Sequence, residues 1–371
     1  MKISEIRIIH YRAPLREPFT TSFGTMKVRD TVLIMLRDDE GYVGWGEAPV
    51  DNGPWYNPET INTAMHVIRD YIIPFLKGKE IKHPCILRGI LSRIRGHNMA
   101  KAGVEFAVWD LYAKRHGEPL YRMIGGVKRR VEAGLSIGVI GDIDKLLKSI
   151  ALGLNKGYRR IKIKIKPGWD ILPVKTIRRE YGDIPLQVDA NAAYTLHEHR
   201  VFVELDKHGL LMIEQPLHYD DLYMHSILQR MIETPICLDE SIKNIYDAMA
   251  GHSLGSYKVI NIKPARVGGL CETLAIHWYA SQHGIPVWIG GLLETGIGRA
   301  FQIAAATLPN VRYPNDVSES SRFYEEDVIE KPWRLEKDGT YIVPERPGIG
   351  VEVREDVIIR HAEKALSISL S

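Results

Sequence analysis

The chain has 371 residues, of which 45% are hydrophobic and 26% are charged, and its formal net charge at pH 7 is +3. This length allows a large core and two domains. The small charge comes from scattered basic residues and argues against a nucleic acid or an anionic membrane as partner. No stretch approaches the roughly 20 apolar residues of a membrane span. The N-terminal residues lack the apolar run of a signal peptide, so a cytoplasmic protein is expected.

Residues 1 to 125 have a mixed α and β pattern. Residues 31–50 predict a β-hairpin that turns at Asp38–Gly41. Two amphipathic helices are predicted at 57–78 and 99–117, the second with Gly117 as its C-cap. Three cysteines, Cys85, Cys237 and Cys271, are odd in number and far apart. They favour buried thiols in a reducing compartment over a disulfide framework.

From about residue 132 the pattern changes to short apolar strands that alternate with helical stretches. Alternation over this length predicts parallel strands joined by helices, and about seven units favour a (β/α) barrel over a short doubly wound sheet. The tail after residue 320 is less regular and is expected to return to the N-terminal part. The predicted strands are residues 133–139, 159–165, 185–190, 210–216, 235–240, 257–264 and 286–291.

The strand at 159–165 has one isoleucine face and one lysine face. Ile161, Ile163 and Ile165 alternate with Lys162 and Lys164. Because side chains alternate faces along a strand, the isoleucines are predicted to pack outward against helices. The two lysines would then point inward near the barrel mouth, roughly 7 Å apart along the strand. Lys166 follows the strand and is predicted to be solvated.

Five predicted strands end in a charged residue, at intervals of 25, 25, 25 and 24 residues: Lys164, Asp189, Glu214, Asp239 and Lys263. One strand–helix unit separates each pair, so these residues occupy equivalent places around one mouth, where barrel active sites lie. Two carboxylates 4 Å apart repel by about 4 kcal/mol at an effective dielectric of 20. Three of them need a cation, and all-oxygen ligands favour Mg²⁺, with Mn²⁺ as a substitute.

A divalent cation with a lysine on each side suggests one reaction. The cation binds a substrate carboxylate, a base removes the proton from the adjacent carbon, and the cation stabilises the resulting enediolate. A lysine base needs its pKa lowered by roughly three units, which nearby cations favour. Lys162 lies beside Lys164, and Arg266 lies three residues after Lys263.

These residues belong to motifs that resemble a known family. The motifs are the Lys162-x-Lys164 pair, VDANAAYT, IEQPL, CLDES, NIKPARVGG and GGLLETGIGRA. Together they resemble the muconate-lactonizing subgroup of the enolase superfamily. Within it they are most similar to the o-succinylbenzoate synthase and N-succinylamino acid racemase family, and the likeness covers nearly the whole chain.

The resemblance implies an α/β fold, a (β/α)₇β modified TIM barrel with an α+β capping domain. The capping domain would span 1–125, the barrel 126–320 and the returning segment 321–371. It implies Asp189, Glu214 and Asp239 as Mg²⁺ ligands. It also implies Lys164 and Lys263 as acid/base residues on opposite faces of the substrate, with Lys162 tuning Lys164.

Two cap loops, residues 18–25 and 52–57, are expected to close over the site. Their Phe19, Phe23, Trp55 and Tyr56 would form an apolar wall, although ordinary packing between cap and barrel explains such aromatic residues about as well. Arg266 and Glu240 are expected to support the ligands from behind. The predicted substrate-binding residues are Phe19, Phe23, Tyr56, Ser136, Asn191, Gly291, Leu292 and Ile297.

The substrate is expected to be a small carboxylate, and a homo-oligomer is expected by base rate. Two reactions remain open, the dehydration that forms o-succinylbenzoate in menaquinone biosynthesis and the racemisation of N-succinyl or other N-acylamino acids. Muconate cycloisomerase-type and dipeptide epimerase activities are alternatives. The stretch YPNDVSES lacks the paired aspartates expected of a dipeptide epimerase. The seventh strand also lacks the final histidine that a mandelate racemase would require, which argues against that subgroup. A Schiff-base aldolase using Lys164 or Lys263 and a non-catalytic barrel are the alternatives from other classes.

Overall fold

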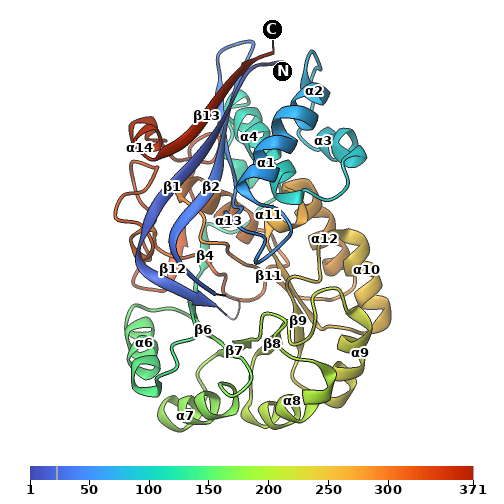
Figure 1. The fold of residues 1–371 in the computed structure, drawn as a ribbon, viewed down its shortest axis with the longest axis vertical. Helices are drawn as coiled ribbons and strands as arrows, with labels where there is room; N and C mark the ends of the chain where they lie inside the picture. Colours follow the sequence, from blue (N-terminus) through green and yellow to red (C-terminus); the bar gives the residue numbers. More distant parts are fainter. Residues whose placement is uncertain (22–23, 371) are drawn as a thin grey trace.

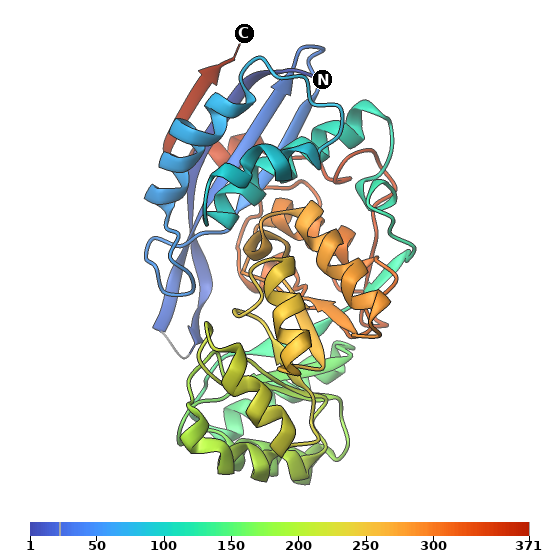
Figure 2. The same cartoon turned by 90° about the vertical axis from the view of Figure 1, so that its right-hand side faces the viewer.

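The protein is described by a computed structural model that covers residues 1–21 and 24–370. A cap of antiparallel strands and helices lies above a barrel of parallel strands (Figures 1 and 2). None of the described helices is both long and apolar enough to cross a membrane. The helices are α1 (Ile61–Val67), α2 (Ile73–Leu76), α3 (Ile86–Ile90), α4 (Asn98–Arg115), α5 (Leu120–Met123), α6 (Ile143–Asn155), α7 (Ile171–Tyr181), α8 (His199–Leu205), α9 (Leu222–Met231), α10 (Ile245–Leu254), α11 (Pro264–Val267), α12 (Leu270–Gln282), α13 (Gly296–Ala306) and α14 (Glu355–Arg360).

The cap sheet joins the two ends of the chain. It comprises β1 (Ile3–Thr21), β2 (Gly24–Asp38), β3 (Val43–Ala48) and β13 (Ala362–Ser369), in the order β13-β1-β2-β3. The predicted hairpin is confirmed, since β2 and β3 pair antiparallel across Asp38–Gly41. The last strand, drawn in red, runs beside the first (Figure 1). The C-terminal segment therefore ends in the cap, and the domain boundaries at residues 125 and 320 stay predictions.

Helix α4 packs closely on the cap sheet because β3 carries glycine there. A Cβ atom on Gly46 would lie 2.1 Å from the carbonyl oxygen of Gly103, which no side chain tolerates. The helix ends one residue earlier than predicted. Its C-cap is His116, and Gly117 follows with a φ of 68°, the left-handed conformation that glycine adopts at low cost.

All seven predicted parallel strands are confirmed. They are β5 (Gly134–Ile137), β6 (Arg160–Lys164), β7 (Leu186–Asp189), β8 (Met212–Glu214), β9 (Ile236–Leu238), β10 (Val259–Ile262) and β11 (Val287–Ile289), and they lie side by side in chain order. Helices lie outside this curved sheet (Figure 1). Ile161, Ile163 and Ile165 are buried in the main hydrophobic core, as predicted, and Lys166 is exposed.

The eighth barrel position is filled by a short irregular segment, residues 311–315. A bridge pairs Val311 with Val287 of β11, and another pairs Asn315 with Ala133 just before β5. The amide of Gly134 donates to the carbonyl of Asn315 at 2.8 Å, while Arg312 donates to Val287 at 2.9 Å. This segment thus links the two edges of the seven-stranded sheet. Short β12 (Thr340–Ile342) and β4 (Arg130–Glu132) form a separate pair.

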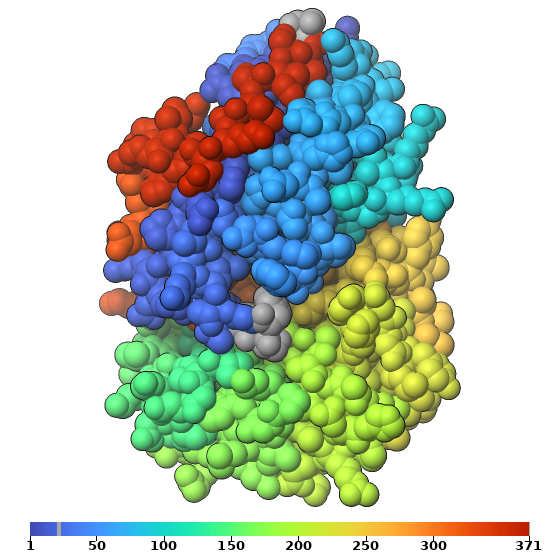
Figure 3. All heavy atoms as spheres, in the orientation of Figure 1, coloured from blue at the N-terminus to red at the C-terminus, as the bar shows by residue number. Residues whose placement is uncertain are grey.

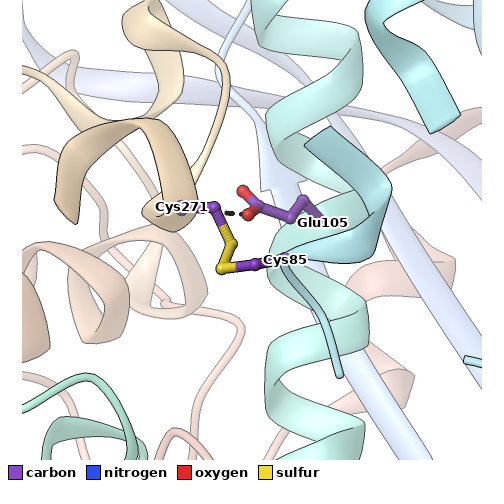
Figure 4. Close-up of side chains that lie close together, drawn as sticks. All are labelled: Cys85, Glu105 and Cys271. Carbon is purple, nitrogen blue, oxygen red and sulfur yellow. Dashed lines mark hydrogen bonds between the residues drawn. A yellow bond between two sulfur atoms is a disulfide. The ribbon is translucent and has the colours of Figure 1, made fainter. Parts of the chain in front are cut away.

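The expectation of three free thiols is wrong for two of the cysteines. Cys85, just before α3 in the cap, and Cys271, in α12 of the barrel, form a disulfide with their Cα atoms 5.4 Å apart (Figure 4). The pairing depends on how the cap sits on the barrel, because 186 residues separate the two positions in the sequence. Glu105 of α4 accepts a 3.0 Å hydrogen bond from the amide of Cys271 beside this disulfide. Cys237 is a buried free thiol, as predicted.

Candidate active site

The five charged residues predicted at strand ends gather at one end of the barrel. Lys164 is paired in register with Asp189, and Asp189 with Glu214, on the neighbouring strands β6, β7 and β8. Asp239 follows β9 directly, and Lys263 follows β10. Every one of these side chains is buried, the most accessible being Lys164 with 8% of its surface exposed. The regular sequence spacing therefore does correspond to a single site.

Each predicted acid/base lysine is paired with a predicted metal ligand. Lys164 Nζ donates to Asp189 Oδ2 at 2.6 Å and to the side-chain oxygen of Asn191 at 2.6 Å. Lys263 Nζ lies 2.8 Å from Asp239 Oδ2. Strands β7, β8 and β9 lie between the two lysine-bearing strands, so the amines approach the carboxylates from opposite sides.

Lys162 lies one layer deeper in the barrel and bridges three carboxylates. Its Nζ is 2.5 Å from Asp316, 3.1 Å from Glu214 and 3.3 Å from Asp189. Burial would lower the pKa of Lys162, but the surrounding carboxylates, Asp316 foremost, outweigh burial and raise it. Lys162 is therefore a fixed positive charge behind Lys164.

The other pKa values also reflect the pairing of charges. Burial would raise the pKa of Asp189, but Lys164 and Lys162 outweigh it and bring the value to about 2. Burial would lower the pKa of Lys263, but Tyr56, Glu240 and Glu214 raise it. Anionic and phenolic groups around the amine cause this direction. The lowered pKa predicted for a lysine base includes the effect of a bound cation and stays a prediction.

Neighbouring side chains hold the carboxylates in place. Glu214 accepts hydrogen bonds from Asn261 at 2.7 Å and from Gln187 at 2.6 Å. Asp239 is contacted by Arg266, which also donates to the carbonyl of Asn261 at 2.6 Å. Glu240 accepts from Asn191 at 2.9 Å. Arg266 therefore contacts a predicted metal ligand directly, whereas Glu240 bonds Asn191, which in turn bonds Lys164.

The three carboxylates fit a hard divalent cation by their chemistry. They supply only oxygen donors, the ligands that Mg²⁺ prefers, and the contact of Asp239 Oδ2 with a charged group is the ion pair with Lys263 at 2.8 Å. Their ligand atoms are not all within 4.8 Å of one another, and each carboxylate contacts a lysine, Asp189 with Lys164, Glu214 with Lys162 and Asp239 with Lys263. Among the described residues, Cys85, Glu105 and Cys271 do have possible ligand atoms within 4.8 Å of one another. The two sulfur atoms of that group are joined in the disulfide.

A cavity of about 560 Å³ lies over these residues, between the barrel mouth and the cap. Cap and barrel atoms meet directly on the face drawn in Figure 3. From the cap, Tyr56 donates to Asp239 at 3.1 Å and accepts from Lys263 at 3.1 Å. Six predicted substrate-binding residues line the cavity together with Trp55: Phe19, Tyr56, Ser136, Asn191, Gly291 and Leu292.

Two other predicted substrate-binding residues have a different outcome. Ile297 lies in the hydrophobic core with none of its surface exposed and is not among the described residues that line the cavity. It is the second residue of α13, and all the residues of this helix are buried. Phe23 lies outside the described residues, so its predicted contact with substrate stays a prediction.

Sequence reasoning missed several polar partners of the charged cluster. Gln187 and Asn261 lie two residues before Asp189 and Lys263, so they share the inward face with them. The alternation that identified Lys162 would have found both. Asp316, which pairs with Lys162 and lies 2.6 Å from Arg160, follows the irregular eighth segment, where no strand pattern marks it.

Comparison with known proteins places the chain in a family. Residues 3–125 match the mandelate racemase / muconate lactonizing enzyme N-terminal domain, and residues 146–357 match the enolase C-terminal domain-like family. The chain is 45% identical to o-succinylbenzoate synthase of Geobacillus kaustophilus over 365 residues, 98% of this chain and 97% of that protein. It is 44% identical to N-succinylamino acid racemase of Amycolatopsis sp. over 352 residues, 95% of each.

A solved structure shows the same fold. The crystal structure of an enolase superfamily member from Listeria innocua superposes with a TM-score of 0.97 at 38% identity and covers 100% of both chains. The predicted barrel with a capping domain is thereby confirmed, as is the predicted resemblance. The protein is an enzyme that belongs to the enolase superfamily, with the two-domain organisation of mandelate racemase and muconate lactonizing enzyme.

Proposed function

We propose that Asp189, Glu214 and Asp239 hold one Mg²⁺ and that Lys164 and Lys263 move the proton on the carbon next to a substrate carboxylate. One observation carries the proposal. Two buried lysines reach the same cavity from β6 and from the end of β10, with three carboxylate-bearing strands between them. A proton can then be removed on one face of a bound substrate and returned on the other.

The bound cation would supply Lewis acidity that stabilises the negative charge developing on the substrate carboxylate. The chain's own residues position and exchange the proton. Asn191 holds the amine of Lys164 at 2.6 Å, and Tyr56 accepts from Lys263 at 3.1 Å, so each amine has a fixed direction. Phe19, Trp55 and Tyr56 of the cap give the cavity an apolar wall.

Two reactions share this proton removal, and we propose that the enzyme performs one or both. They are the dehydration that forms o-succinylbenzoate and the racemisation of N-succinylamino acids. Relatives named for these reactions have nearly equal identity to this chain, 45% and 44%. In racemisation both lysines exchange protons. In the dehydration Lys164 takes the proton and delivers it to the leaving hydroxyl group, so that water is released, while Lys263 contributes positive charge.

The test is to replace a proposed ligand and titrate the metal. Asp239→Asn should lower the apparent affinity for Mg²⁺ by about 100-fold or more, since losing even a group that only supports a ligand costs 10–100-fold. Activity should fall with it. The matched control is Asp220→Asn, an exposed aspartate paired with Lys243, which should leave both values unchanged. Full activity after chelation and removal of metal refutes the proposal.

A further inference from the structure

The wall of the cavity contains two arginines that are unlike its other cations. Arg12 pairs with Asp30. Lys162, Lys164 and Lys263 pair with carboxylates inside the barrel mouth. Arg299 and Arg322 also line the cavity, but no carboxylate of the described residues lies within 4.0 Å of either guanidinium. Lys27 of the cap is likewise unpaired, but it is exposed to water, where an ammonium needs no partner.

Arg299 is almost completely buried, with 2% of its surface exposed. It projects from α13, and its one hydrogen bond to a described residue is long, 3.4 Å to the hydroxyl of Ser320. A guanidinium stays charged under all ordinary conditions and carries five N–H donors. Burying such a group without an anion is unfavourable. The geometry therefore leaves donors of Arg299 for a group that enters the cavity.

Arg322 lies beside Arg299 and shares a partner with it. The two guanidinium carbons lie 5.1 Å and 5.6 Å from the centre of the same ring, that of Phe323. Arg322 also donates to the carbonyl of Ser136 and, at 3.4 Å, to the hydroxyl of Ser318, two further residues of the cavity wall. Burial lowers the pKa of Arg322, Asp316 opposes this, and the nearby Arg299 adds to the lowering.

Arg299 and Arg322 lie at a different end of the cavity from the three carboxylates. Arg299 follows β11, and Arg322 contacts Ser136 of β5, so the pair lies at the seam where residues 311–315 join the sheet edges. The three carboxylates follow β7, β8 and β9, in the middle of the strand row. One end of the cavity thus carries the proposed metal ligands. The other carries two arginines with no carboxylate of the described residues within 4.0 Å, since the nearby Asp316 pairs with Lys162 and Arg160.

We propose that Arg299 and Arg322 form a subsite for a second anionic group of the substrate, the terminal carboxylate of its acyl chain. This inference rests on the proposed function, because the succinyl group of the proposed substrates ends in such a carboxylate. Guanidinium matches the planar shape of a carboxylate and binds it through two parallel hydrogen bonds. The pair selects acyl chains that end in a charge over neutral chains of equal length.

The experiment compares two achiral ligands, N-succinylglycine and N-butyrylglycine, which have acyl chains of equal carbon number but differ in the terminal carboxylate. Their Kd values are measured by calorimetry with the Mg²⁺-loaded enzyme. The wild type should bind N-succinylglycine at least about tenfold more tightly, as expected for hydrogen bonds between charged groups. Arg299→Gln and Arg322→Gln should each reduce that preference several-fold, and Arg322→Lys should retain more of it than Arg322→Gln.

The matched control is Lys166→Gln, which removes one positive charge from an exposed position outside the cavity lining and should leave the preference unchanged. Equal affinity of the wild type for both ligands overturns the inference. Equal losses for both ligands in the arginine variants overturn it too, because they indicate that the arginines only support the fold. Binding does not depend on turnover, so an enzyme that shows the preference but no racemisation or dehydration contradicts the proposed function alone.

Discussion

The floor and the wall of the cavity are built differently. The floor consists of Lys162, Lys164, Asp189, Glu214, Asp239 and Lys263. Each of them is buried, lies within or directly after one of the strands β6 to β10, and is paired with an opposite charge. The wall comes from separate segments, including β1, β2 and the loop after β3 in the cap, α13, and the chain after the eighth segment. Two of its arginines have no carboxylate partner among the described residues. On the proposals made above, the floor would carry out a proton transfer that several substrates share, and the wall would select among those substrates.

The largest effect should come from the floor. Lys164→Ala should reduce both racemisation and dehydration by about 10²–10⁴-fold, the usual contribution of a general acid–base group. Lys166→Ala is the matched control, because it removes a lysine two residues later that is exposed and outside the cavity. Steady-state rates of both variants measure the difference. Near-normal rates for Lys164→Ala in both assays show that the proposed role of this strand is wrong.

A change at the other lysine separates the two reactions. Lys263→Arg keeps the positive charge near Asp239 but removes a base that can exchange protons near neutral pH. Racemisation should therefore lose on the order of 10²-fold more than dehydration. The ratio of the two losses is the measured quantity, because an arginine side chain also changes the fit. Equal losses indicate that Lys263 has the same role in both reactions.

The floor was predictable from the sequence and most of the wall was not. Strand ends recur every 24 or 25 residues from Lys164 to Lys263, and the fold turns that regular spacing into proximity. The wall depends on how loops, the cap and the irregular eighth segment come together over long sequence distances. Asp316 was missed for that reason. Ile297 was assigned to the substrate pocket from its motif, but it packs into the core.

The disulfide joins cap to barrel and should affect stability more than activity. Cys85 and Cys271 are 186 residues apart, and closing a loop of that size stabilises by up to roughly 5 kcal/mol in the chain-entropy model. A reductant should lower the unfolding temperature of the wild type but not that of Cys85→Ser. Thiol titration of the unreduced, unfolded protein should find one thiol, Cys237. Three titratable thiols contradict the pairing.

The central claim is that two lysines act on opposite faces of one carbon, and exchange with deuterated solvent tests it most directly. Lys164→Ala and Lys263→Ala are each incubated with the separate enantiomers of an N-succinylamino acid in D₂O with Mg²⁺. Incorporation of deuterium is followed by NMR. Each variant should exchange the α-proton of one enantiomer without racemising it, and the two variants should act on opposite enantiomers. Racemisation of either enantiomer by either variant at wild-type rates contradicts the claim.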